Sequence, residues 1–160
     1  MSNRSMREVV ARAVSDPGAV MRALGEPCQA GAHILHRTAD LTIVNIVWPI
    51  GYIIPPHNHG MWAVIGVYAG REDNILWRRL PEGSAAGVEA AGAKTLGERE
   101  VLPLGADVIH SVINPVNRLT GAIHIYGGDF YGVPRSEWEP DQLREKPYDM
   151  ERLLKMSGQA

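Results

Sequence analysis

The spacing of apolar residues changes near residue 27 from a helical to an extended pattern. Before that point, apolar side chains recur at the spacing of one helix face after Ser5, the expected N-cap. Asp16-Pro17 predicts the start of a second helix, with the cap followed by Pro at the first helical position, and Gly25 predicts its end. We therefore expect residues 1–26 to form a short helical appendage.

From Cys28 onward, apolar residues alternate with polar ones or form short β-branched runs bounded by Gly, Pro and Asn. Residues 81–93 are rich in Ala and Gly and are interpreted as a long hairpin loop or a ragged edge strand. This density of strands predicts an all-β sandwich or barrel over residues 27–138 of a single domain. Residues 139–160 form a polar tail with a terminal helix over 148–156. About eight strands are expected, at residues 33–37, 41–48, 51–59, 62–68, 74–80, 98–102, 107–113 and 119–126.

The composition excludes several classes of protein. Of 160 residues, 45% are hydrophobic and 21% charged, which is ordinary for a globular domain. The net charge of −2 gives no reason to expect nucleic acid or a membrane as a partner. Cys28 is the single cysteine, so no intrachain disulfide can form, and the residues after Met1 are polar rather than a signal-peptide core. Both features favour a cytoplasmic protein.

His57 and His59 are the first candidates for chemistry. In an extended chain, residues i and i+2 project from the same side, so both imidazoles can share one ion. A helix is disfavoured here because Pro55 and Pro56 precede the pair. Taken alone, the pair is equally compatible with two surface histidines. A third histidine, His110, follows in a segment rich in Gly and Pro.

The segment Gly51 to His59, closed by Gly70, resembles the first sequence motif of the cupin superfamily. The segment Gly97 to Asn114, with Pro103-x-Gly105 and His110, resembles the second motif with one extra residue before the histidine. The resemblance implies a double-stranded β-helix, or jelly-roll barrel, with short N-terminal helices and a C-terminal helix packed outside it. It also implies a metal ion inside the barrel, held by His57, His59 and His110.

The first cupin motif normally adds a glutamate where this chain has Ala63 or Val64, neither of which can bind a metal. A site of three imidazoles is neutral and suits Fe, Zn, Cu or Ni. Within the cupins, such a site resembles that of the thiol dioxygenases, which implies non-haem Fe(II), with Zn or Ni as alternatives in purified protein.

Further residues are similar to cysteine dioxygenase and 3-mercaptopropionate dioxygenase. Residues 57–67 are similar to the pattern HDHxxWxVIGV, and residues 123–128 to the late strand carrying His-x-Tyr. The resemblance implies catalytic roles for Tyr126 and His124 and a place near the substrate for Trp62. It also implies that Arg135 holds the substrate carboxylate through two parallel hydrogen bonds.

Two positions depart from that family. Ala122 replaces the serine that normally bonds the histidine corresponding to His124, and residues 60–67 contain no cysteine to cross-link to Tyr126. The hypothesis is an Fe(II)-dependent thiol dioxygenase that converts 3-mercaptopropionate or cysteine to a sulfinate with O₂. The alternatives are a metal-dependent cupin oxygenase or hydrolase acting on a non-thiol, and a non-catalytic cupin that binds a metal or a small ligand. The resemblance is also compatible with a homodimer.

Overall fold

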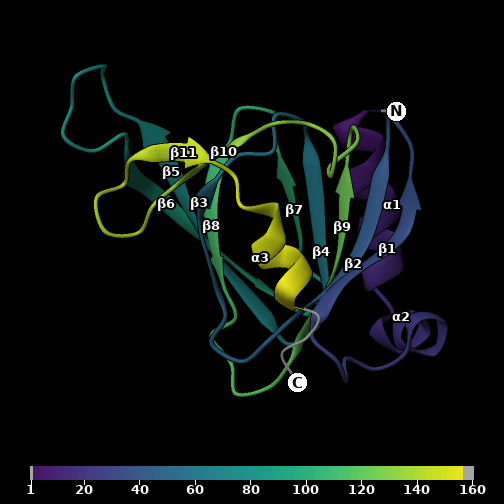
Figure 1. Ribbon diagram of the computed structural model, residues 1–160. Coiled ribbons are helices and arrows are strands. Elements are labelled where there is room, and N and C mark those ends of the chain that lie inside the picture. The colour runs from purple at the N-terminus through teal and green to yellow at the C-terminus, as the bar shows by residue number, and fades with distance from the viewer. Residues whose placement is uncertain (1, 157–160) are drawn as a thin grey trace.

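The computed structural model describes residues 2–156 and contains two antiparallel β-sheets that share an inner core (Figure 1). Strands distant in sequence are neighbours in both sheets, so the chain crosses repeatedly between them. The predicted all-β double-stranded architecture is confirmed. The five-stranded sheet has the order β1 (Gly31–Arg37), β2 (Thr42–Trp48), β9 (Thr120–Tyr126), β4 (Ala63–Ala69), β7 (Val101–Leu104). The six-stranded sheet has the order β11 (Glu145–Pro147), β10 (Ser136–Trp138), β3 (Ile53–His57), β8 (Ile109–Ile113), β5 (Arg71–Arg79), β6 (Val88–Gly97).

Helices α1 (Asn3–Val14) and α2 (Pro17–Leu24) form the predicted N-terminal appendage, and α3 (Met150–Lys155) is the predicted terminal helix. Asp16 caps α2 by accepting a hydrogen bond from the amide of Ala19 at 3.0 Å, as expected. The prediction of Ser5 as the N-cap of α1 is wrong. Ser2, in extended backbone, is the cap, and its hydroxyl accepts from the amide of Ser5. None of the described helices combines the length and the apolar character needed to cross a membrane.

The predicted strands begin and end within three residues of the observed ones; β5, for example, begins at Arg71 rather than at residue 74. β6 is an edge strand that begins at Val88, so the second half of residues 81–93 pairs with β5, as one of the two interpretations had it. The strand expected at 98–102 begins at Val101, because a turn containing Arg99 at φ 72° follows Gly97. β10 and β11 are three-residue strands that sequence periodicity missed, and β11 lies in the tail predicted to carry only a helix. Part of the predicted tail, β11, therefore belongs to the sheet that also contains β3 and β8.

Alternation along β4 separates two buried layers. Ala63 and Ile65 face the core between the sheets, whereas Val64 and Tyr68 face the layer under α1 and α2. Helix α1 lies close to this outer face because Gly66 has no side chain; a Cβ there would lie 2.3 Å from a methyl carbon of Val10. The five-stranded sheet is thus covered on both sides. Part of its inner face also lines a pocket between the two sheets.

Candidate metal centre

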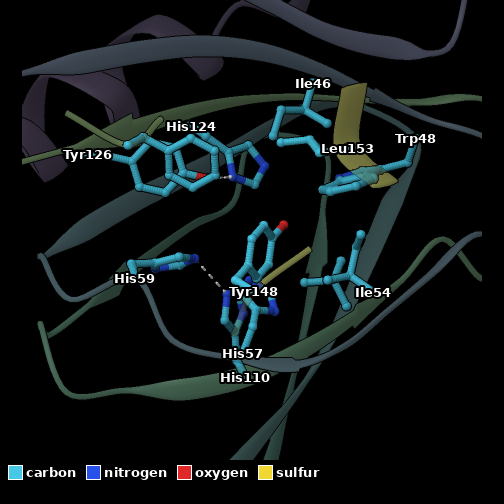
Figure 2. A pocket seen from close by; sticks show the side chains of 12 residues that line it. Ile46, Trp48, Ile54, His57, His59, His110, His124, Tyr126, Tyr148 and Leu153 are labelled. Atoms are coloured by element: carbon cyan, nitrogen blue, oxygen red, sulfur yellow. Dashed lines mark hydrogen bonds between the residues drawn. The ribbon is translucent and has the colours of Figure 1, made fainter. Parts of the chain in front are cut away.

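Three histidines from the six-stranded sheet and its adjoining loop gather inside the barrel. His57 ends β3, His110 lies opposite it on β8 as its register partner, and His59 follows β3 by two residues. Each side chain is nearly fully buried, and their ring centroids lie 4.5 to 5.1 Å apart. One nitrogen of each ring lies within 4.8 Å of the others, an arrangement that can hold a metal ion. Figure 2 shows the three rings directed toward one another.

The outward nitrogens of two of these rings are already engaged. His57 Nδ1 donates to the carbonyl of Pro55 at 2.9 Å, and His110 Nδ1 to Asn74 Oδ1 at 2.7 Å. This leaves Nε2 of each ring for a metal, because neutral imidazole has one donor and one acceptor nitrogen. His59 Nε2 and His110 Nε2 lie 3.3 Å apart. Two ligands at metal–nitrogen distances of about 2.0–2.1 Å are separated by roughly that length, so the donor set fits a divalent ion.

Burial keeps the three histidines in the form that binds metal. It lowers the pKa of His57 to about 4. Burial also lowers the pKa of His59 and His110 well below 6.5, with neighbouring histidines adding to the effect. All three are neutral at neutral pH, as imidazole ligands must be. Among residues 2–156 the cluster includes no carboxylate, so an M²⁺ ion there would keep its full charge.

The opposite wall of the pocket is formed by β9 of the five-stranded sheet. His124 Nδ1 lies 3.1 Å from the hydroxyl of Tyr126, and the Tyr126 ring meets that of His59 edge to face at 5.1 Å. Burial raises the pKa of Tyr126 well above 10, so the phenol stays protonated. The cavity is about 10 Å³, roughly the room that one water needs, so any organic ligand requires a lining side chain to move. The lining residues are Ile46, Trp48, Ile54, His57, His59, His110, Val112, His124, Tyr126, Phe130, Tyr148 and Leu153.

No family model matches the sequence. A cupin-family protein with a double-stranded β-helix fold from Methanocaldococcus jannaschii aligns over 67% of this chain and 86% of its own, with 14% identity and a TM-score of 0.52. The chain has the cupin fold. A Bacillus halodurans protein aligns over 63% of this chain and 72% of its own, with 17% identity and a TM-score of 0.53. At these identities the similarity establishes the cupin architecture and does not extend to a reaction.

Arg135 lies beside the candidate metal pocket rather than in its lining. Its guanidinium lies between two aromatic rings that do line the pocket, 3.9 Å from the centroid of Phe130 and 4.3 Å from that of Tyr148. Nη1 donates to the carbonyl of Phe130. Nε and Nη2 are buried and have no hydrogen-bond partner among the described residues. Buried donors without partners are rare in folded proteins, and a bound water or a ligand group would satisfy these two.

Trp62 is the predicted site residue that the structure does not bring to the pocket. It precedes Ala63 by one residue, so strand alternation sends it to the outer side with Val64, where it packs under the N-terminal helices. Its indole lies over Gly127, where a Cβ would come within 2.1 Å of the ring.

Sequence reasoning also missed residues that belong to the site. Tyr148 lies in the polar tail, yet its ring reaches within 5.6 Å of that of His57. From the sequence, Glu72 is a candidate only as one of three acidic residues that could meet a substrate amino group, and Asn74 is not a candidate. Both are buried on β5 while Ile75 is exposed. The available signal was their spacing. Two residues at i and i+2 of a strand have their side chains on the same face of the sheet. The Nε2 atom of His124 lies 3.5 Å from Glu72 Oε2.

Proposed function

We propose that this protein is a non-haem Fe(II)-dependent thiol dioxygenase that oxidises a small carboxylate-bearing thiol, 3-mercaptopropionate or cysteine, to its sulfinate. The observation that carries the proposal is the neutral cluster of His57, His59 and His110, which includes no carboxylate and faces a buried phenol. The resemblance of residues 57–67 and 123–128 to thiol dioxygenases supports the same reaction.

The overall reaction converts R–SH and O₂ to R–SO₂H, with sulfur losing four electrons and O₂ accepting them. Bound iron would supply a site for sulfur as thiolate and would activate dioxygen there. Tyr126 is protonated and its ring lies against that of His59. Its single O–H would have to turn from His124 Nδ1 toward the pocket to donate a hydrogen bond to oxygen there. His124 orients that hydroxyl through the contact at Nδ1.

Arg135 would select a substrate with a carboxylate. Elsewhere in this chain, Arg37 grips Asp129 through Nε and Nη2 at 2.7 and 2.9 Å, and Arg71 grips Asp73 through the same two atoms. Arg135 presents that same edge without a partner among residues 2–156. A carboxylate there would receive two parallel charge-assisted hydrogen bonds. Phe130 or Tyr148 must rotate to connect this edge with the small cavity at the histidines.

An oxygen-uptake assay on iron-loaded protein tests the proposal. We expect uptake and a sulfinate product with 3-mercaptopropionate or cysteine, and less with cysteamine, which lacks a carboxylate. Tyr126→Phe should reduce the rate, whereas Tyr68→Phe, at a buried tyrosine in the outer layer, should not. Protein with stoichiometric iron and no uptake with any of the three thiols would overturn the proposal. That outcome would favour a cupin acting on a non-thiol or a non-catalytic binding protein.

A further inference from the structure

Glu72 is a fully buried carboxylate that is not among the candidate ligands. Each of its two oxygens accepts a hydrogen bond. Oε1 accepts from Asn74 Nδ2 at 3.1 Å, and Oε2 accepts from Trp48 Nε1 at 2.8 Å. Burial by itself raises the pKa of Glu72, but the contacts with His124, Asn74 and Trp48 leave the pKa below its usual value. The group is therefore ionised, and an ionised carboxylate only accepts hydrogen bonds.

One branch from Glu72 runs through Asn74 to the candidate ligand His110. Because Glu72 only accepts, the amide of Asn74 must turn its NH₂ toward Oε1, which leaves Asn74 Oδ1 facing His110. An amide oxygen only accepts, so His110 must carry its proton on Nδ1. Nε2 of His110 is thereby left with a lone pair directed at the other histidines. Glu72 thus determines the tautomer of the candidate ligand His110 through one intervening side chain, Asn74.

The other branch runs from Glu72 directly to His124. Nε2 of His124 is buried and has no hydrogen-bond partner within normal geometry among the described residues. It lies 3.5 Å from Glu72 Oε2. A proton on Nε2 satisfies that carboxylate and holds the ring with Nδ1 toward the hydroxyl of Tyr126, at 3.1 Å. The serine expected two residues before His124 is replaced by Ala122, so Glu72 supplies the polar contact from a different strand.

We propose that Glu72 is a positioning residue that fixes the proton positions of His110, through Asn74, and of His124 by direct contact. The inference rests on the metal site of the proposed function but not on thiol oxidation.

The replacement Glu72→Gln separates this role from mere space filling. Glutamine has the same shape but offers one acceptor oxygen and one donor NH₂. If the NH₂ faces Asn74, two donors meet and the Asn74 amide must flip, which removes the acceptor of His110. If the NH₂ faces Trp48 and His124, it meets the indole N–H instead. Every orientation of the new glutamine therefore leaves one of the two branches broken.

The double variant Glu72→Gln/Asn74→Asp restores every pairing. The NH₂ of the new glutamine donates to the new aspartate, which also accepts from His110 Nδ1. The glutamine oxygen accepts from Trp48 and His124. The negative charge moves by one side chain while both histidines keep their tautomers. A matched control is Glu137→Gln, which also alters a fully buried carboxylate but one bonded to Arg152 rather than to a histidine.

The test is ¹⁵N NMR of the histidine side chains in zinc-loaded protein, combined with zinc affinity measured by chelator competition. We expect wild type and Glu137→Gln to show Nδ1–H at His110 and Nε2–H at His124. Glu72→Gln should lose one of these signals and bind zinc about 10- to 100-fold more weakly, the usual cost of altering a partner of a metal-binding histidine. The double variant should recover both properties, including when Glu72→Gln alone does not fold. Unchanged tautomers and affinity in Glu72→Gln, or a double variant no better than the single one, would overturn the proposal, whatever the outcome of the oxygen-uptake assay.

Discussion

Replacing Arg135 with methionine separates a substrate-binding arginine from a structural one. Methionine keeps much of the length of the side chain and its contact with Phe130 and Tyr148 but removes the charge and all five donors. If the free edge of Arg135 binds the substrate carboxylate, the variant loses two hydrogen bonds to a charged group, each worth about 1.5–3 kcal/mol. The sum of about 3–6 kcal/mol corresponds to a loss of roughly 10²- to 10⁴-fold in kcat/KM.

The same replacement should cost little stability. Two buried donors without partners each cost about 1–3 kcal/mol, and Arg135→Met removes both. Against this gain stand two cation–π contacts of about 0.5–2 kcal/mol each and the hydrogen bond to Phe130. These contributions nearly cancel, so Tm should move by only a few degrees.

The assay is kcat/KM for 3-mercaptopropionate and for cysteamine, with Tm from thermal denaturation. The drop should appear with the carboxylate substrate and be absent with cysteamine. Arg71→Met is the matched control, because the same edge of Arg71 is already occupied by Asp73, and its activity should be unchanged. A variant that keeps kcat/KM for 3-mercaptopropionate within about threefold, or that unfolds, would refute the assigned role of Arg135.

Three further predictions concern stability. Gly127→Ala places a methyl group 2.1 Å from the Trp62 ring and should destabilise the fold by about 1–3 kcal/mol, seen as a lower Tm; an unchanged Tm would contradict the packing described. In metal-free protein, burial lowers the pKa of His57 to about 4, so its contribution to stability is complete above pH 6.5 and is lost as the pH falls toward 4. Thermal denaturation with a chelator across that range should show the decline, and His57→Gln should make it shallower without abolishing it, because the pKa values of His59 and His110 are also lowered. The ion pair with Arg152 lowers the pKa of Glu137 to about 2 against the opposing effect of burial, so its contribution is present above about pH 4.5 and is lost toward pH 2. Denaturation curves of Glu137→Gln should lack that acid dependence, and curves that match wild type would exclude the pair as its source.

Two of the three candidate ligands could be predicted from geometry that is local in sequence. His57 and His59 are two residues apart in extended chain, and His110 lies in a second motif that the fold brings opposite the first. The pairing of β3 with β8, which places His57 beside His110, comes from the resemblance to a known fold rather than from periodicity. The all-β architecture, in contrast, was predicted from the density of strands and from the turn residues between them.

The rest of the pocket depends on contacts that no local pattern encodes. Tyr148 reaches the site because β11 adds to the edge of a sheet, and that three-residue strand exists only through its pairing with β10. The sequence does not show that Glu72 is buried, because a charged residue next to Arg71 and Asp73 is expected to be solvated. Trp62 could have been placed correctly, since the inward direction of Ala63 already sends its neighbour outward.

Metal binding by the His57, His59 and His110 cluster is the property on which the function depends. Equilibrium dialysis of metal-free protein against Fe(II) under anaerobic conditions measures it directly. Wild type, and a His33→Ala control altered at an exposed position on β1, should bind one ion per chain. Replacement of any one of the three clustered histidines by alanine should abolish stoichiometric binding while the protein stays folded. Wild-type protein that binds no iron, or alanine variants that bind it as wild type does, would contradict the metal centre.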